Sequence, residues 1–178
     1  SVTSIGKGCF AKCNSLTTLS IPSSVIEMGP NMFLGCTKLS NVELPSSITR
    51  IESYTFQNCP SLKKITFPSS VESIGKYSLS KCTSLVDVSL PSSLESIKAF
   101  LFWKSSALET IVIPSSVKII KNGAFYGCTS LVNIQIPTSV TEIRRNAFHD
   151  CSALKEIVIP SSVIKIGDYT FTNCTSLK

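Results

Sequence analysis

Proline recurs along the chain at a constant interval of 23 residues, and this interval constrains the fold more than any other feature. The prolines that keep the interval are Pro22, Pro45, Pro68, Pro91, Pro114, Pro137 and Pro160. A repeat of this length with leucines at fixed offsets is typical of a solenoid, in which stacked units share one apolar interior because no unit can bury its apolar face alone. We therefore expect residues 1–178 to form a single array with its functional residues on an outer wall.

Alternating apolar residues predict one short strand in each unit. When Leu16 is counted as position 1, positions 4 and 6 are apolar in every unit, as in Ile65 and Phe67, and the residue between them faces outward. This alternation predicts a half-buried strand, and stacked copies predict a parallel sheet. The proline at position 7 has no N–H for the ladder and ends the strand. The Ser-Ser pair after it is expected to hydrogen-bond its own backbone through a turn.

The remainder of the unit supplies the opposite wall and an aromatic interior. Positions 10 and 13 are apolar and predict the opposite wall, and position 18 holds phenylalanine in seven of eight units, with Leu79 as the exception. Small residues before these phenylalanines, such as Ala124 and Ala147, predict a short helical or 3₁₀ turn. The expected fold is a right-handed, β-rich solenoid of about 7.7 repeats, with a parallel sheet on one face and short extended and 3₁₀ or helical turns on the other.

Seven of the eight cysteines share position 21, and Ser105 holds that position in the remaining unit. Neighbouring coils stack about 4.8 Å apart, which separates parallel Cβ atoms by more than the roughly 3.5–4.5 Å that a disulfide accepts. The column therefore predicts a ladder of buried free thiols that act as small hydrophobic side chains. Cys9 lies outside the column, so Cys9 and Cys13 form the only local candidate pair for a disulfide.

The sequence offers no constellation for catalysis or for a metal. Its single histidine, His149, has no G-x-S-x-G motif near it, and Asp150 is adjacent in sequence rather than placed to orient the ring, so a surface histidine is expected. A column of cysteines is a line, whereas zinc needs four ligands that converge on a point. We expect no enzymatic activity, no cofactor and no metal.

The net charge of +6 comes from lysines and arginines that are spread over the repeats, and the longest basic runs are pairs such as Arg144-Arg145. This scatter favours a solvated surface over nucleic-acid binding, which needs a contiguous basic stripe. No apolar run is long enough to span a membrane, and the chain starts with no signal segment. Because the chain begins and ends in mid-repeat, we expect it to be a fragment of a longer array without terminal caps.

Two outer surfaces are candidates for a partner. The strand face exposes positions 2, 3 and 5, and its candidate binding residues are Lys63, Lys64, Asp87, Glu109, Asn133, Gln135, Lys155 and Glu156. The alternative is an aromatic strip at positions 16 and 19, formed by Tyr54, Tyr77, Phe100, Trp103, Tyr126 and His149. Each surface also has an interpretation without a partner. The strand face can be a plain solvated sheet, and the rings of the aromatic strip can simply cover the edges of adjacent coils.

Units such as Ile136-Pro137-Thr138-Ser139-Val140-Thr141-Glu142-Ile143, followed by Asn146-Ala147-Phe148-His149-Asp150-Cys151, resemble BspA-like (Treponema-type) leucine-rich repeats. The resemblance covers the whole chain, because proline, Ser-Ser, phenylalanine and cysteine recur in phase. It implies a leucine-rich repeat fold and a family of surface proteins of bacteria and parasitic protists that is associated with adhesion. The family has no catalytic residues and no shared ligand motif to transfer.

Three functions remain open at this point. The resemblance implies a noncatalytic, protein-binding scaffold of the adhesin type, located at the cell surface or secreted, with a host extracellular-matrix or cell-surface protein as its partner. The first alternative is a cytoplasmic scaffold that docks a regulatory protein. The second is a structural array that associates end to end, because uncapped ends would expose residues such as Ile5 and Phe171.

Overall fold

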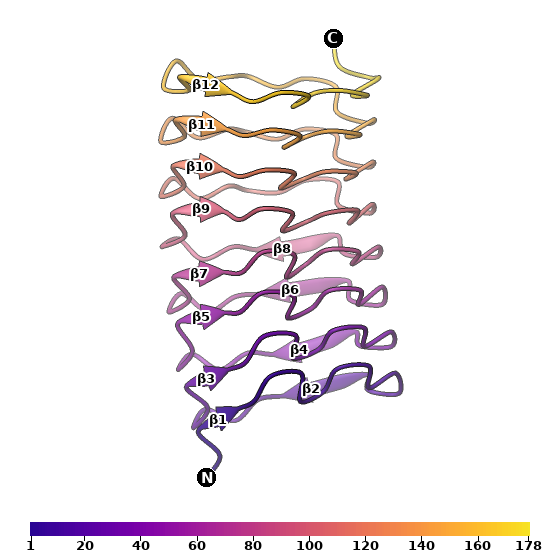
Figure 1. Ribbon diagram of the computed structural model, residues 1–178, viewed down its shortest axis with the longest axis vertical. Coiled ribbons are helices and arrows are strands. Elements are labelled where there is room, and N and C mark those ends of the chain that lie inside the picture. Colours follow the sequence, from indigo (N-terminus) through magenta and orange to yellow (C-terminus); the bar gives the residue numbers. More distant parts are fainter.

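The computed structural model describes all residues from Ser1 to Lys178 as an elongated stack of coils with the termini at opposite ends (Figure 1). One coil corresponds to one 23-residue unit, because equivalent residues of successive units pair directly. Ile65 and Val88, for example, are partners in a parallel ladder. The predicted solenoid is therefore confirmed.

One wall, which we call the strand face and which is the more distant one in Figure 1, carries three-residue strands in its first half. These strands are β2 (Thr18–Ser20), β4 (Asn41–Glu43), β6 (Lys64–Thr66) and β8 (Asp87–Ser89). They pair as β2 with β4 and β6 with β8, always in parallel. Beyond β8 only two isolated bridges remain, Val112 with Gln135 and Asn133 with Glu156. Residue type does not explain this change, because residues 110–113 are as β-branched as the strands before them.

The opposite wall, which we call the back wall and which lies nearer to the viewer in Figure 1, carries a two-residue strand in every coil. The strands are β1 (Ser4–Ile5), β3 (Glu27–Met28), β5 (Arg50–Ile51), β7 (Ser73–Ile74), β9 (Ser96–Ile97), β10 (Ile119–Ile120), β11 (Glu142–Ile143) and β12 (Lys165–Ile166). The last four form one continuous parallel sheet in the order β12-β11-β10-β9. The opposite wall that positions 10 and 13 predicted is thus confirmed, and it contains strands of its own.

A single cluster of 42 buried apolar residues fills the space between the two walls. The phenylalanines of position 18 stack in it with nearly parallel rings, and Phe125 lies 5.3 Å from Phe102 and 5.2 Å from Phe148 between ring centroids. Phe56 and Phe125 have no exposed surface. At Leu79 the stack is interrupted, and the fully buried Leu101 of the next coil adds volume where the two coils after it have alanine.

Each coil turns without forming a helix, which corrects the expected helical or 3₁₀ turn. The phenylalanine segment closes through turn hydrogen bonds, such as Cys36 N–H to the Phe33 carbonyl at 3.1 Å. Positions 16 and 20 adopt left-handed backbone angles, for example φ of 59° at Tyr77 and 57° at Lys81. A right-handed helix cannot pass through such residues, so two of them in every coil limit the segment to single turns.

Hydroxyls and thiols join each coil to the one before it. The second serine of the Ser-Ser pair donates to a carbonyl of the preceding coil, as Ser70 Oγ does to Ile48 at 2.7 Å. The expectation that this pair bonds its own turn is wrong for that serine. Cys128 Sγ likewise donates to the Phe102 carbonyl at 3.2 Å, and Ser105 makes the equivalent bond to Leu79 at 2.6 Å. The column therefore supplies donors as well as apolar volume.

Thiol labelling should separate two exposed cysteines from six buried ones. Cys9 and Cys13 are exposed, whereas the other six cysteines are buried. Burial raises the pKa of Cys82 to about 12, so its thiolate is scarce at neutral pH. We expect a thiol reagent at about pH 7.5 to modify two thiols rapidly in the folded protein and all eight in denaturant. Rapid modification of a third thiol would contradict the buried ladder.

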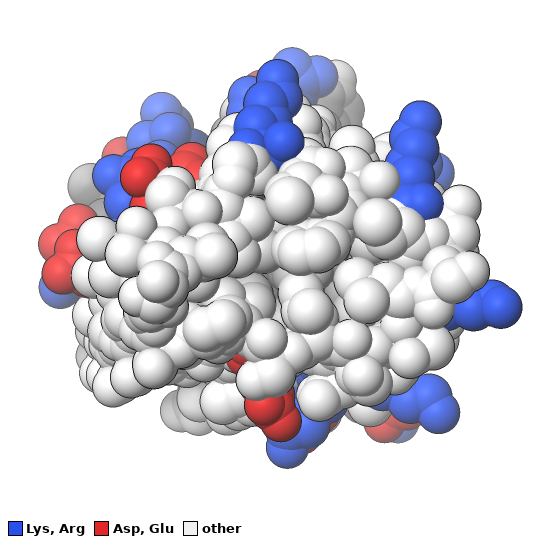
Figure 2. All heavy atoms as spheres, turned by 90° about the horizontal axis from the view of Figure 1, so that it is seen from below, with Lys and Arg blue, Asp and Glu red and all other residues white.

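Charged side chains stand at the rim of the stack. Figure 2 shows the array from the end where β1 lies, and Lys, Arg, Asp and Glu surround an end that is covered by uncharged residues. No helix is present that could span a membrane. No group of three or more His, Cys, Asp or Glu side chains is placed to hold a metal ion.

Candidate binding surfaces

The first half of the strand face is a regular sheet with a surface ion pair. Lys64 Nζ lies 2.8 Å from Asp87 Oδ2, across the β6–β8 ladder, and both side chains are more than half exposed. Such an exposed pair contributes about 0–1 kcal/mol to stability. Lys63 is exposed beside it and has no ion-pair partner. These three predicted residues therefore lie together on the regularly paired part of the strand face.

The second half of the strand face is hollowed. One hollow of about 670 Å³ lies between residues 133–136 and 156–158, and a second of about 350 Å³ lies between residues 110–113 and the side chains of Asn133 and Gln135. Both hollows occur where the ladder is reduced to single bridges. The structure thus brings Asn133, Gln135 and Glu156 together, while Glu109 and Lys155 are exposed on the same face.

Two exposed valines, which the sequence analysis did not select, line these hollows. Val112 is 83% exposed and Val158 is 79% exposed, and both occupy position 5, with Gln135 between them in the column. In the first half of the face the same position holds Ser20, Glu43, Thr66 and Ser89. This change from polar to apolar residues was visible in the sequence. The candidate binding residues were chosen among charged and amide side chains, so the two valines were not among them.

The first part of the aromatic strip is a closed stack. Tyr54 and Tyr77 lie 5.2 Å apart between ring centroids, and Tyr77 and Phe100 lie 4.8 Å apart. Trp103 contacts Tyr77 edge-on, with 6.3 Å between ring centroids. The ammonium groups of Lys81 and Lys104 lie over the Trp103 ring, 5.1 and 5.0 Å from its centroid. The ring faces are therefore occupied by neighbouring side chains.

The second part of the strip is a separate pair. Tyr126 and His149 stack at 4.6 Å, and His149 Nδ1 lies 3.2 Å from Asp150 Oδ1. The side chain of His149 is only 18% exposed, so the expectation of a surface histidine is wrong. Its Nδ1 has no hydrogen-bond partner, so Asp150 lies near the ring without orienting it, as the sequence predicts. A hydrogen bond from Asn173, followed by the charge of His149, lowers the pKa of Asp150.

Comparisons with known proteins agree with this architecture. The chain matches the family model described as the BspA type leucine rich repeat region, in six copies over residues 3–118 and 101–178. No curated protein matched the chain.

Solved structures of bacterial proteins are also similar. A leucine rich repeat protein from T. pallidum is 31% identical, with a TM-score of 0.67 over 99% of this chain and 72% of its own. A leucine rich cell surface protein from Faecalibacterium prausnitzii is 30% identical, with a TM-score of 0.67 over 88% of this chain and 51% of its own. A leucine-rich repeat protein from Eubacterium ventriosum is 26% identical, with a TM-score of 0.61 over 99% and 56%.

Proposed function

Since the chain belongs to the BspA-type leucine-rich repeat family, we propose that it is a noncatalytic, protein-binding scaffold of the adhesin type. It acts at the cell surface or after secretion and attaches to a host extracellular-matrix or cell-surface protein. The similar protein from F. prausnitzii is described as a cell surface protein, which supports this location. The observation that carries the proposal is the hollowed half of the strand face with its exposed valines.

The hollowed half has the composition of a protein-binding surface. Val112 and Val158 provide exposed apolar groups, Gln135 lies between them, and Asn133 and Glu156 add further hydrogen-bonding groups. Protein interfaces combine apolar contacts with hydrogen-bonding groups in this way. Parallel coils on a continuous core hold these side chains on a rigid wall, which lowers the entropy cost of binding. The aromatic strip is less suited, because its ring faces are already in contact with one another.

A cytoplasmic scaffold that docks a regulatory protein is the second candidate. It is favoured by the eight unpaired cysteines, because thiols persist in a reducing compartment. The same hollowed surface would serve it, with a different partner.

Substitution of the exposed valines tests the proposal. We expect the Val112→Glu/Val158→Glu variant to bind purified matrix proteins and cultured epithelial cells at least about tenfold more weakly than the unaltered chain, a loss of about 1.4 kcal/mol. The matched control is Ser20→Glu/Ser89→Glu, which adds the same charges in the same column on the regular half. We expect the control to bind within about twofold of the unaltered chain.

Each part of the proposal can fail separately. Absence of binding to any matrix protein or cell would contradict the adhesin function. Equal losses in the two variants would contradict the placement of the binding surface. Both variants should unfold at the same denaturant concentration as the unaltered chain, because all four positions are exposed.

A further inference from the structure

A row of cationic side chains runs along the back wall. Position 14 holds Lys98, Lys121 and Arg144 in three consecutive coils, directly after β9, β10 and β11. These strands pair in register, so residues that are 23 apart in sequence become neighbours about 4.8 Å apart. The expectation that basic residues are scattered is therefore wrong for this wall.

The two lysines of this row, Lys98 and Lys121, have no carboxylate partner. Arg144 pairs with Glu142 at 3.0 Å, and on the opposite side of the lysines Arg50 pairs with Glu52 at 3.5 Å. Lys98 and Lys121 form no ion pair, although both are half-buried against the wall. Burial, followed by the charges of Lys98 and Arg144, lowers the pKa of Lys121. Adjacent positive charges without a counter-ion repel each other, and an anion bound between them would remove this repulsion.

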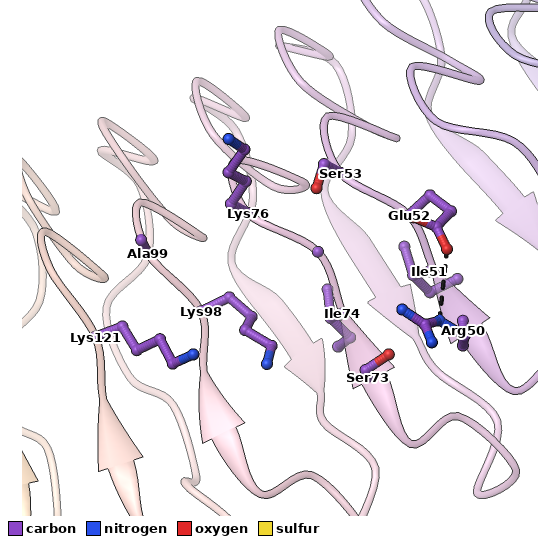
Figure 3. Close-up of a pocket in the computed structure, with 11 residues that line it drawn as sticks. Arg50, Ile51, Glu52, Ser53, Ser73, Ile74, Lys76, Lys98, Ala99 and Lys121 are labelled. Atoms are coloured by element: carbon purple, nitrogen blue, oxygen red, sulfur yellow. Dashed lines mark ion pairs between the residues drawn. The ribbon is translucent and has the colours of Figure 1, made fainter.

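A hollow lies in front of these lysines. Figure 3 shows Lys98 and Lys121 pointing in the same direction, each toward the preceding coil, while Lys76 points away. The hollow has a volume of about 350 Å³ and runs past Gly75, which holds position 14 in the coil before Lys98 and packs closely against the backbone of Ser53. Ser73 lines the same hollow and adds a hydroxyl donor.

We infer that this wall binds a linear sulfated polysaccharide, with sulfate groups held by Lys98 and Lys121 in the hollow and the sugar chain following the row toward Arg144. Lysine ammonium groups act as compact point charges, which suit sulfate oxygens in any orientation. The row is spaced by the coil repeat, so it presents charge at regular intervals to a polymer that carries charge at regular intervals.

Other polyanions fit this wall less well. A protein partner needs large apolar or aromatic anchors, but the two large apolar side chains of this hollow, Ile51 and Ile74, are buried. Single-stranded nucleic acid needs open aromatic faces for its bases. The nearby rings of Tyr77 and Phe100 stack on each other at 4.8 Å and offer no face between them.

Binding to immobilised heparin, measured over a series of salt concentrations, tests the inference. We expect the Lys98→Gln/Lys121→Gln variant to lose about tenfold or more in affinity, and the slope of log K against log salt to fall by about two. The matched control is Lys63→Gln/Lys155→Gln, which removes the same charge from exposed, unpaired lysines of the strand face. We expect the control to stay within about twofold of the unaltered chain.

Three results would overturn the inference. The first is equal loss in both variants, which would show a diffuse effect of net charge. The second is no heparin binding at low salt. The third is binding of polyglutamate, hyaluronate or single-stranded DNA as tight as that of heparin, which would exclude recognition of sulfate. The valine variant of the strand face should bind heparin normally, so failure here and failure of the proposed function are distinguishable.

Discussion

Raising the pH from about 8.5 to about 10 should destabilise this protein by several kcal/mol, because buried thiols resist ionisation only in the folded state. Burial raises the pKa of Cys82 to about 12 and raises those of Cys59, Cys128 and Cys151 further. In the unfolded chain the same thiols ionise near pH 8.5.

The direction of the effect follows from proton binding. Above about pH 8.5 the unfolded chain binds fewer protons than the folded protein, so the free energy of unfolding falls as pH rises. The stability due to neutral thiols is fully present below that pH and is lost as pH rises toward the folded-state pKa. Each thiol contributes up to about 1.4 kcal/mol per pH unit, and the four together up to about 5.6 kcal/mol per pH unit. Denaturant midpoints measured with reductant at about pH 7.5, 9 and 10 should fall accordingly.

Serine provides the control for this experiment, because Ser105 already occupies the column and donates the equivalent hydrogen bond at 2.6 Å. A variant with serine at Cys59, Cys82, Cys128 and Cys151 retains the donors and loses the titrating groups. We expect its midpoint to depend much less on pH between about 8.5 and 10. An equally steep fall in this variant would show that other groups cause the alkaline destabilisation.

The second large effect is expected from Phe125→Ala, with a loss of about 3–5 kcal/mol in the free energy of unfolding. Phe125 is fully buried and stacks on a phenylalanine on each side, at 5.3 and 5.2 Å. Truncation removes both stacking contacts and leaves a cavity in the middle of a continuous core. Denaturant unfolding followed by circular dichroism measures the loss.

Phe171→Ala is the matched control for this substitution. Phe171 has one stacking partner, Phe148 at 5.6 Å, and is only partly buried. Its truncation should cost less than half as much as that of Phe125, because the site is already open to solvent. Equal losses at the two positions would contradict a stack whose interior members are held from both sides.

Columns of apolar residues predicted the two walls and the core, because burial of one face in every coil forces the same residue type to recur at 23-residue spacing. What the sequence analysis missed lies between coils. Ser70 was expected to hydrogen-bond its own turn and Cys128 to act only as a small hydrophobic side chain, yet both donate hydrogen bonds to the coil before. The row formed by Lys98 and Lys121 was missed for the same reason, because neighbours across the stack are distant in sequence.

The candidate binding surface was predictable only in part. Alternation identified which residues of the strand face point outward, and these include Asn133, Gln135 and Glu156. The loss of regular pairing beyond β8 could not be predicted, because residues 110–113 are as β-branched as the strands before them. The hollows beside Val112 and Val158 depend on that loss, so only coordinates reveal them.

The serine and cysteine donors give the stack a direction that matters during synthesis. In the serine column from Ser24 to Ser139 and in the cysteine column from Cys36 on, the hydroxyl or thiol donates to a carbonyl 22 or 26 residues earlier in the chain, as in Ser116 to Leu94 and Cys151 to Phe125. The acceptor has therefore left the ribosome before its donor is made. Every new coil can dock at once onto the coil already in place, so the protein can grow from its N-terminal end without waiting for any later segment.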